Sequence, residues 1–190
     1  KNVEININVA TAGQAARVID QFQTGEFETR PFFESSYLST FTGLPAGRNL
    51  EVLTGLIQDI GQLFFKQKLS EEKIYQGISE RLLKENQTGG LRESLKYFEG
   101  KGAIWGITAD NFHVAELYGS AYEELAKIYG ERIKQLNEDG SANCVVATGG
   151  VLEKNDILYQ IFQKKCPLIL RKSLIKDSVI AGHARLALVD

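Results

Sequence analysis

The chain contains no methionine, only two cysteines and only two histidines in 190 residues. Cys144 and Cys166 show neither a pairing pattern nor metal-ligand spacing, so a reducing, cytoplasmic setting is expected. His113 and His183 are too few for a His/Cys metal cluster, and no metal-binding residue is expected in the chain. Because a native full-length protein begins with methionine, its absence predicts a fragment or a processed form of a longer protein.

Long apolar runs and an excess of charge are also absent. No apolar stretch approaches the ~20 residues of a membrane span, and no signal peptide precedes Lys1, so no membrane partner is expected. The net charge is −2 and the basic residues are scattered, which gives no reason to expect a nucleic-acid partner. The chain is long enough for one domain with a sizeable core, or for two small ones.

Strand patterns stand first in the chain, and helical patterns follow. Residues 3–9 alternate apolar and polar, the period of a half-buried strand, while residues 14–22 fit either a second strand or a short helix. The other expected elements are a hairpin of 27–33 and 37–41, a loop at 42–47, helices at 49–66 and 70–84, a surface loop at 86–90, a compact segment at 102–108, a helix at 111–136, a strand at 143–148, a helix at 155–165, a strand at 168–170 and a final helix at 178–188. This order predicts an α/β or α+β fold whose sheet is parallel at least in part.

Two glycine-bearing segments, 8–14 and 145–156, carry most of the functional information. Each follows a strand pattern and supplies bare backbone amides and a small hydroxyl at the strand's end. Phosphate binds to such groups, especially beside a helix N-terminus. Two such ends from one sheet can hold a nucleotide between them, although either segment alone also fits an ordinary turn. Neither is a Walker loop, because no Gly-Lys-Ser/Thr follows.

Five landmarks occur in one order along nearly the whole chain. They are a phosphate segment at 7–14, an aromatic hairpin at 30–38, a glycine-bracketed segment at 102–107, an adenosine motif at 148–160 and a small-residue helix at 177–184. Together they resemble the C-terminal half of the FGGY carbohydrate kinases, with the closest likeness to sedoheptulokinase-like members. Two residues depart from the family's pattern: Ala10 stands where Gly is usual, and His183 lies in a terminal helix that usually has only small residues.

The resemblance implies an α/β, actin-like ATPase (ribonuclease H-like) fold, with a mixed, roughly five-stranded sheet flanked by helices. It implies that residues 1–190 form a single C-terminal nucleotide-binding domain, and that the N-terminal sugar-binding domain is absent from this chain. The full-length enzyme would transfer the γ-phosphate of ATP, with Mg²⁺, to a sedoheptulose- or xylulose-like ketose. Its catalytic Asp would lie upstream, so no catalytic residue is expected here and the isolated chain would be inactive. The expected partners are the sugar, ATP and the chain's own N-terminal domain, and a homodimer is one open oligomeric state.

The resemblance also implies which residues bind the nucleotide. Phosphate-binding residues would be Thr11, Ala12 and Gly13, and nucleotide-binding residues would be Gly149, Gly150, Val151 and Asn155. Glycines at 149 and 150 would let the backbone approach the α-phosphate and the adenine plane without a side chain in the way. Asn155 and Asp156 can each cap a helix or contact the base and ribose; we assign Asn155 to the ligand and Asp156 to the cap.

Two other functions remain open at this point. The same fold serves actin-like filament formers and reactivating chaperones, in which a nucleotide drives assembly rather than sugar phosphorylation. A degenerate domain that binds a partner and no nucleotide is the third reading, and Ala10 is the feature that hints at it. A Gly-Asp-x-Gln sequence upstream of Lys1 would identify the kinase.

Overall fold

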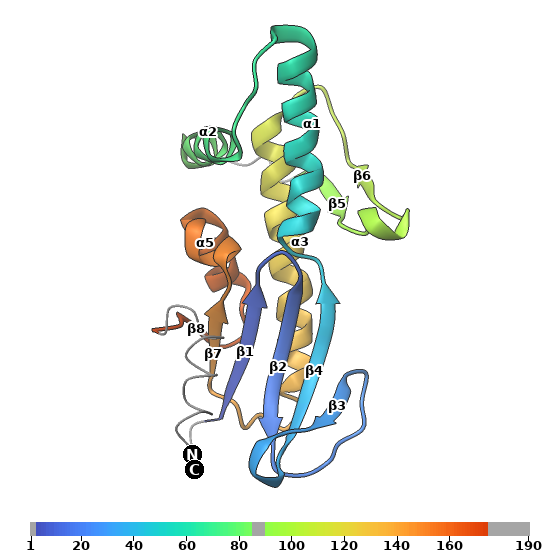
Figure 1. Cartoon of the computed structure of the whole chain (residues 1–190), viewed down its shortest axis with the longest axis vertical. Helices are drawn as coiled ribbons and strands as arrows, with labels where there is room; N and C mark the ends of the chain where they lie inside the picture. Colours follow the sequence, from blue (N-terminus) through green and yellow to red (C-terminus); the bar gives the residue numbers. More distant parts are fainter. Residues whose placement is uncertain (1–2, 85–89, 175–190) are drawn as a thin grey trace.

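A computed structural model of the chain describes residues 3–84 and 90–174 (Figure 1). Its central element is a six-stranded sheet in the order β3-β4-β2-β1-β7-β8. The strands are β1 (Glu4–Val9), β2 (Gly13–Ile19), β3 (Glu28–Pro31), β4 (Tyr37–Leu44), β7 (Cys144–Thr148) and β8 (Ile169–Lys172). β1, β7 and β8 are parallel, whereas β2, β4 and β3 join by antiparallel pairing. The predicted mixed sheet is therefore present, with β3 as a sixth strand at its edge.

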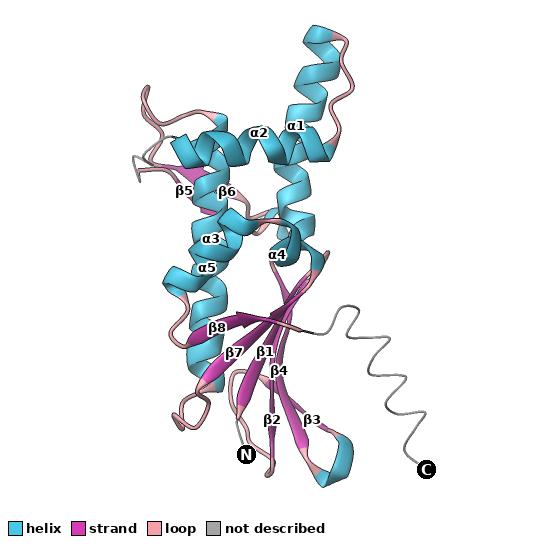
Figure 2. Cartoon of the chain, turned by 90° about the vertical axis from the view of Figure 1, so that its left-hand side faces the viewer, coloured by secondary structure: helices cyan, strands magenta, loops and turns pink. Residues whose placement is uncertain are grey.

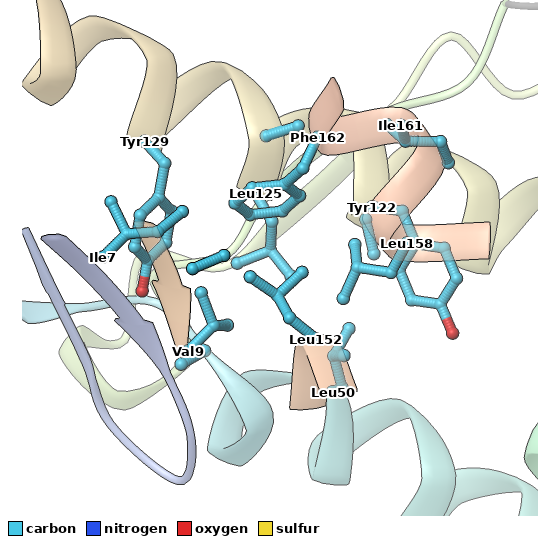
Figure 3. Close-up of a cluster of buried hydrophobic side chains, with 14 of the residues drawn as sticks. Ile7, Val9, Leu50, Tyr122, Leu125, Tyr129, Leu152, Leu158, Ile161 and Phe162 are labelled. Atoms are coloured by element: carbon cyan, nitrogen blue, oxygen red, sulfur yellow. The ribbon is translucent and has the colours of Figure 1, made fainter. Parts of the chain in front are cut away.

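The alternating pattern of β1 places three apolar side chains, Ile5, Ile7 and Val9, on one buried face. Helix α3 (Val114–Leu136) contributes the facing side of the core, including Leu125 and Tyr129, both fully buried. Figure 3 shows Ile7 and Val9 gathered with these two residues in one cluster. The core thus fixes α3 against the strand from which the first glycine segment emerges.

Helices α4 (Gly150–Lys154) and α5 (Asp156–Lys165) connect β7 to β8. Figure 2 shows α3 and α5 on the same side of the sheet. The Phe162 ring of α5 packs on the Tyr129 ring of α3, with their centroids 5.4 Å apart. This crossover lets β7 and β8 run parallel, as the strand–helix–strand pattern predicted.

A second part of the molecule extends beyond the end of the sheet (Figure 1). It contains α1 (Gly47–Phe65), α2 (Glu71–Lys84), and a two-stranded antiparallel sheet of β5 (Arg92–Ser94) and β6 (Ala103–Trp105). Two short 3₁₀ helices connect strands: η1 (Phe33–Ser35) lies between β3 and β4, and η2 (Tyr97–Glu99) lies between β5 and β6. α1 begins directly above the end of β4, so its first turn lies at the same edge of the sheet as the β1–β2 turn.

The structure decides one open sequence prediction and corrects another. Of the two alternatives for 14–22, the strand is present as β2 for most of that length, because it pairs with both β1 and β4. The predicted loop at 42–47 is wrong in its first half, since β4 continues to Leu44, which pairs with Gly13. The helix expected at 178–188 and most of the loop at 86–90 lie outside the described residues. No helix within residues 3–84 and 90–174 is long and apolar enough to cross a membrane.

Candidate nucleotide site

The strands that lead into the two glycine segments, β1 and β7, end side by side. β1 and β7 are parallel neighbours, and Asn8 stands opposite Thr148 in their register. The Thr148 hydroxyl donates a hydrogen bond of 3.1 Å to the Ile7 carbonyl across the pair. Their carboxyl ends therefore lead into two adjacent turns, which we call the first turn (residues 10–12) and the second turn (residues 149–150). In open α/β sheets, ligands bind at this carboxyl edge.

Packing requires Gly149 of the second turn. Its φ is +101°, which L side chains rarely adopt. A Cβ at this position would lie 2.4 Å from the Val9 carbonyl oxygen and 2.5 Å from Asn8 Oδ1. The Gly149 amide donates a 3.2 Å hydrogen bond to Glu153 Oε1. Gly149 is thus the point where the second turn touches the end of β1.

Gly150, the next residue, has the opposite surroundings. A Cβ built on Gly150 would meet no atom within 4 Å, and its φ is not positive. Val151 follows and packs toward α1, because its Cγ2 lies 2.9 Å from where a Cβ on Gly47 would stand. Gly150 therefore faces open space, and a nucleotide contact there stays a prediction, while Val151 contributes to the packing between α4 and α1.

The backbone of the first turn is held by the start of α1. The Gly47 amide donates to the Ala10 carbonyl at 2.8 Å, and the Arg48 amide donates to the Thr11 carbonyl at 3.1 Å. Thr11 and Ala12 are exposed. The carbonyls of the turn are thus engaged with α1 while its small side chains remain accessible.

Gly13, predicted to bind phosphate, is buried where β2 begins. A Cβ there would lie 1.8 Å from the Tyr129 hydroxyl and 2.9 Å from the Leu44 carbonyl oxygen. Burial raises the pKa of the Tyr129 phenol above its ordinary value, so the group stays protonated and donates to the Asn8 carbonyl at 3.4 Å. The requirement for glycine at 13 therefore comes from packing against α3 and β4.

Asn155 serves as the N-cap of α5. Its Oδ1 accepts from the Leu158 amide at 3.0 Å, and its Nδ2 donates to the Tyr122 hydroxyl at 2.7 Å. The cap assigned to Asp156 is therefore wrong: Asp156 is the first helical residue and pairs with Lys172 at 3.0 Å. A nucleotide contact from Asn155 stays a prediction, and its side chain would have to give up one of these bonds to make it.

Neither a metal-binding cluster nor the cavity described below lies at the two turns. Among the described residues, no group of three or more His, Cys, Asp and Glu side chains could hold a metal ion. A cavity of about 840 Å³ lies along α3 beside β5, lined by Glu93 and Trp105 among others, and includes neither turn. At the strand ends, Thr11, Ala12 and Gly150 are exposed to solvent.

Sequence reasoning missed two residues that build this site, Gly47 and Arg48. The segment before them, 42–46, contains Gly43 and Pro45, and these turn residues made the whole stretch read as a loop. The one available signal was that a helical pattern begins directly after it, at Asn49.

No protein-family model matches this sequence, and no curated protein matches it either. Its structure is similar to a xylulose kinase from Rhodospirillum rubrum (TM-score 0.68, 12% identity, 94% of this chain and 36% of that one). It is similar to a xyloylose kinase from Brucella ovis (TM-score 0.72, 13% identity, 93% and 37%) and to a gluconate kinase from Lactobacillus acidophilus (TM-score 0.66, 15% identity, 98% and 39%).

These similarities show the fold. With the strand order described above, they confirm the predicted actin-like ATPase (ribonuclease H-like) architecture. The chain spans less than two fifths of the length of these solved structures.

Proposed function

We propose that this chain is the nucleotide-binding domain of an ATP-dependent carbohydrate kinase. The observation that carries the proposal is the juxtaposition of the two turns at the carboxyl ends of β1 and β7. Support comes from solved structures with the same fold, among them a xylulose kinase and a gluconate kinase. The resemblance to FGGY kinases in the sequence points the same way.

In this proposal the first turn holds the terminal phosphates, through Thr11 and the amides beside it. The second turn holds the adenosine, because Gly150 leaves the space that a base or ribose needs. ATP would supply the transferred phosphoryl group, and Mg²⁺ would neutralise its charge.

The base that accepts the proton of the sugar hydroxyl would lie outside this chain. Glu4, the acidic residue of β1, forms an ion pair with Arg171 and stands at the opposite end of its strand from the first turn. Glu153 accepts the Gly149 amide. A general base must come within ~3 Å of the proton it removes. We therefore infer that the sugar and the base belong to a second domain that closes over the turns.

The test is nuclear magnetic resonance of the ¹⁵N-labelled chain during titration with ATP and Mg²⁺. We expect the largest amide shifts at 10–13 and 149–151, with affinity weakened because one wall of the cleft is missing. Shifts confined to other regions, or none at millimolar ATP, would overturn the proposed site.

A companion assay mixes the chain with ATP, Mg²⁺ and a panel of ketoses, and measures sugar phosphate. We expect none, because the base is elsewhere. Product formed at enzymatic rates would place the base within these 190 residues and contradict this part of the proposal.

A further inference from the structure

We infer that Arg48 is a further phosphate-contacting residue, whose guanidinium reaches the terminal phosphate of a nucleotide bound at the first turn. The inference rests on the proposed function and deepens it, because neither the motifs nor the strand-end glycines point to this residue. Arg48 would supply the positive charge that the two turns themselves lack. Residues 10–13 and 148–150 are Ala, Thr, Ala, Gly, Thr, Gly and Gly, none of them charged.

The backbone of Arg48 already binds the first turn. Its amide donates to the Thr11 carbonyl at 3.1 Å, and the amide of the preceding residue, Gly47, donates to the Ala10 carbonyl. Arg48, the second residue of α1, therefore lies beside the residue predicted to bind the γ-phosphate. Since these first amides are engaged by the turn, the helix end itself is not the anion site, and any attraction must come from the side chain.

The side chain of Arg48 is exposed and lies over the Phe98 ring, with Cζ 3.9 Å from the ring centroid. Asn49 Nδ2 donates to the Leu95 carbonyl, which ties the segment before η2 to the first turn of α1. Phe98, itself 52% exposed, is thereby held to one side of the start of the helix. A cation–π contact at an exposed position is weak, so a phosphate can replace it at small cost.

The order of contacts places Arg48 at the phosphate end of the site. Gly47 touches both the Ala10 carbonyl and the Val151 side chain, so it lies between the two turns. The Arg48 amide bonds to the carbonyl of Thr11, the next residue along the first turn. A nucleotide whose base lies near Gly150 and whose phosphates extend toward Thr11 would bring its last phosphate to Arg48. The planar guanidinium can bond two oxygens of one phosphate at once.

The experiment compares ATP, ADP and AMP, each with Mg²⁺, by amide-detected titration of the 190-residue chain and of Arg48→Gln. The substitution keeps the backbone amide and its bond to Thr11, so it isolates the side chain. We expect ATP affinity to fall about tenfold, as for loss of one charged hydrogen-bonding group, and AMP affinity to change less than twofold. Arg48→Lys should recover part of the loss, and the Arg48 Nε–Hε resonance should shift with ATP but not with AMP.

A control removes the same charge elsewhere. Arg30 lies on β3 and pairs with Glu28, and in Figure 1 β3 lies at the other end of the sheet from the turn between β1 and β2. Arg30→Gln should therefore leave all three affinities unchanged. Unaltered ATP affinity in Arg48→Gln, or an equal loss for AMP, overturns the inference while leaving the proposed function standing. If the unaltered chain shows no shift at either turn with any nucleotide, the proposed function fails, and the role of Arg48 fails with it.

Discussion

The two turns at the carboxyl edge of the sheet use glycine for different reasons. In the second turn, Gly149 is closed in by the end of β1 and has a positive φ, whereas Gly150 beside it faces empty space. Where the first turn meets β2, Gly13 is closed in by Tyr129 and Leu44, while Thr11 and Ala12 of the turn are exposed. Each turn thus has a packed residue that sets its position and a neighbouring open residue that a ligand can reach.

This comparison separates stability from binding. A glycine required by packing should cost folding free energy when it is replaced, whatever the protein binds. A residue with open surroundings should cost little in stability, and its substitution should be felt by the ligand. In the sequence, residues required by packing and residues with open surroundings form the same small-residue pattern. Substitutions at each position can distinguish the two.

Gly149→Ala should produce the largest effect. The added Cβ would lie 2.4 Å from a backbone oxygen, and the φ of +101° is strained for alanine. We expect a loss of about 3 kcal/mol in the free energy of unfolding, measured by urea denaturation.

Gly140→Ala is the matched control for that substitution. Gly140 has a φ of +66° but open surroundings, so its replacement isolates the backbone conformation and should cost about 1 kcal/mol. Equal losses at 149 and 140 would show that the contact with β1 contributes nothing.

Gly13→Ala should destabilise the protein by about 2 kcal/mol, because the new methyl group would collide with the Tyr129 hydroxyl at 1.8 Å. Tyr129→Phe removes that oxygen and gives up only a long, 3.4 Å hydrogen bond. The double variant should therefore recover about 1 kcal/mol relative to the sum of the single changes. Strict additivity in urea denaturation would contradict the contact.

Much of the architecture could be predicted because local patterns and tertiary pairing agree. The alternation in β1 and the helical spacing in α3 describe faces that are buried in the structure. The end of β4 was missed because Gly43 and Pro45 favour a loop, while pairing with β2 extends the strand to Leu44. Pairing between strands far apart in sequence overrides local propensity at such places.

The site could be predicted only in outline. Two strand ends of one sheet were identified, but their adjacency depends on β7 inserting next to β1. Asn155 and Asp156 are both good capping residues. Because the five-residue helix α4 ends just before Asn155, it is Asn155 that caps α5. Arg48 fell between the predicted loop at 42–47 and the helix predicted from Asn49, and its partner Thr11 is 37 positions away in the printed sequence, so no local pattern pointed to it.

Gly150→Val tests the open side of the second turn. Its Cβ would meet no atom of the chain, so we expect unfolding free energy within about 0.5 kcal/mol of the parent and ATP affinity at least about tenfold weaker. Gly77→Val on α2 is the control, since Gly77 also has open surroundings and lies on a helix away from both turns. Unchanged affinity in calorimetric titration of Gly150→Val would remove the nucleotide from this turn.

Thr11→Ala should have the smallest effect, and it tests the open side of the first turn. The side chain is exposed, and the bonds that hold the turn run through its backbone carbonyl to the Arg48 amide, which the substitution keeps. Stability should therefore stay within about 0.5 kcal/mol, while loss of one hydrogen bond from an exposed, uncharged hydroxyl to the phosphate should weaken ATP binding about threefold to fivefold. Thr11→Ser keeps the hydroxyl and should bind ATP like the parent, and AMP should bind all three proteins equally, because its phosphate stays near the second turn. Equal weakening for AMP would mean that the hydroxyl acts on the shape of the whole site, and a Ser variant as weak as Ala would mean that the methyl group is what matters. Either result would contradict the assignment of Thr11 as an open residue whose hydroxyl contacts the terminal phosphates and does not shape the turn.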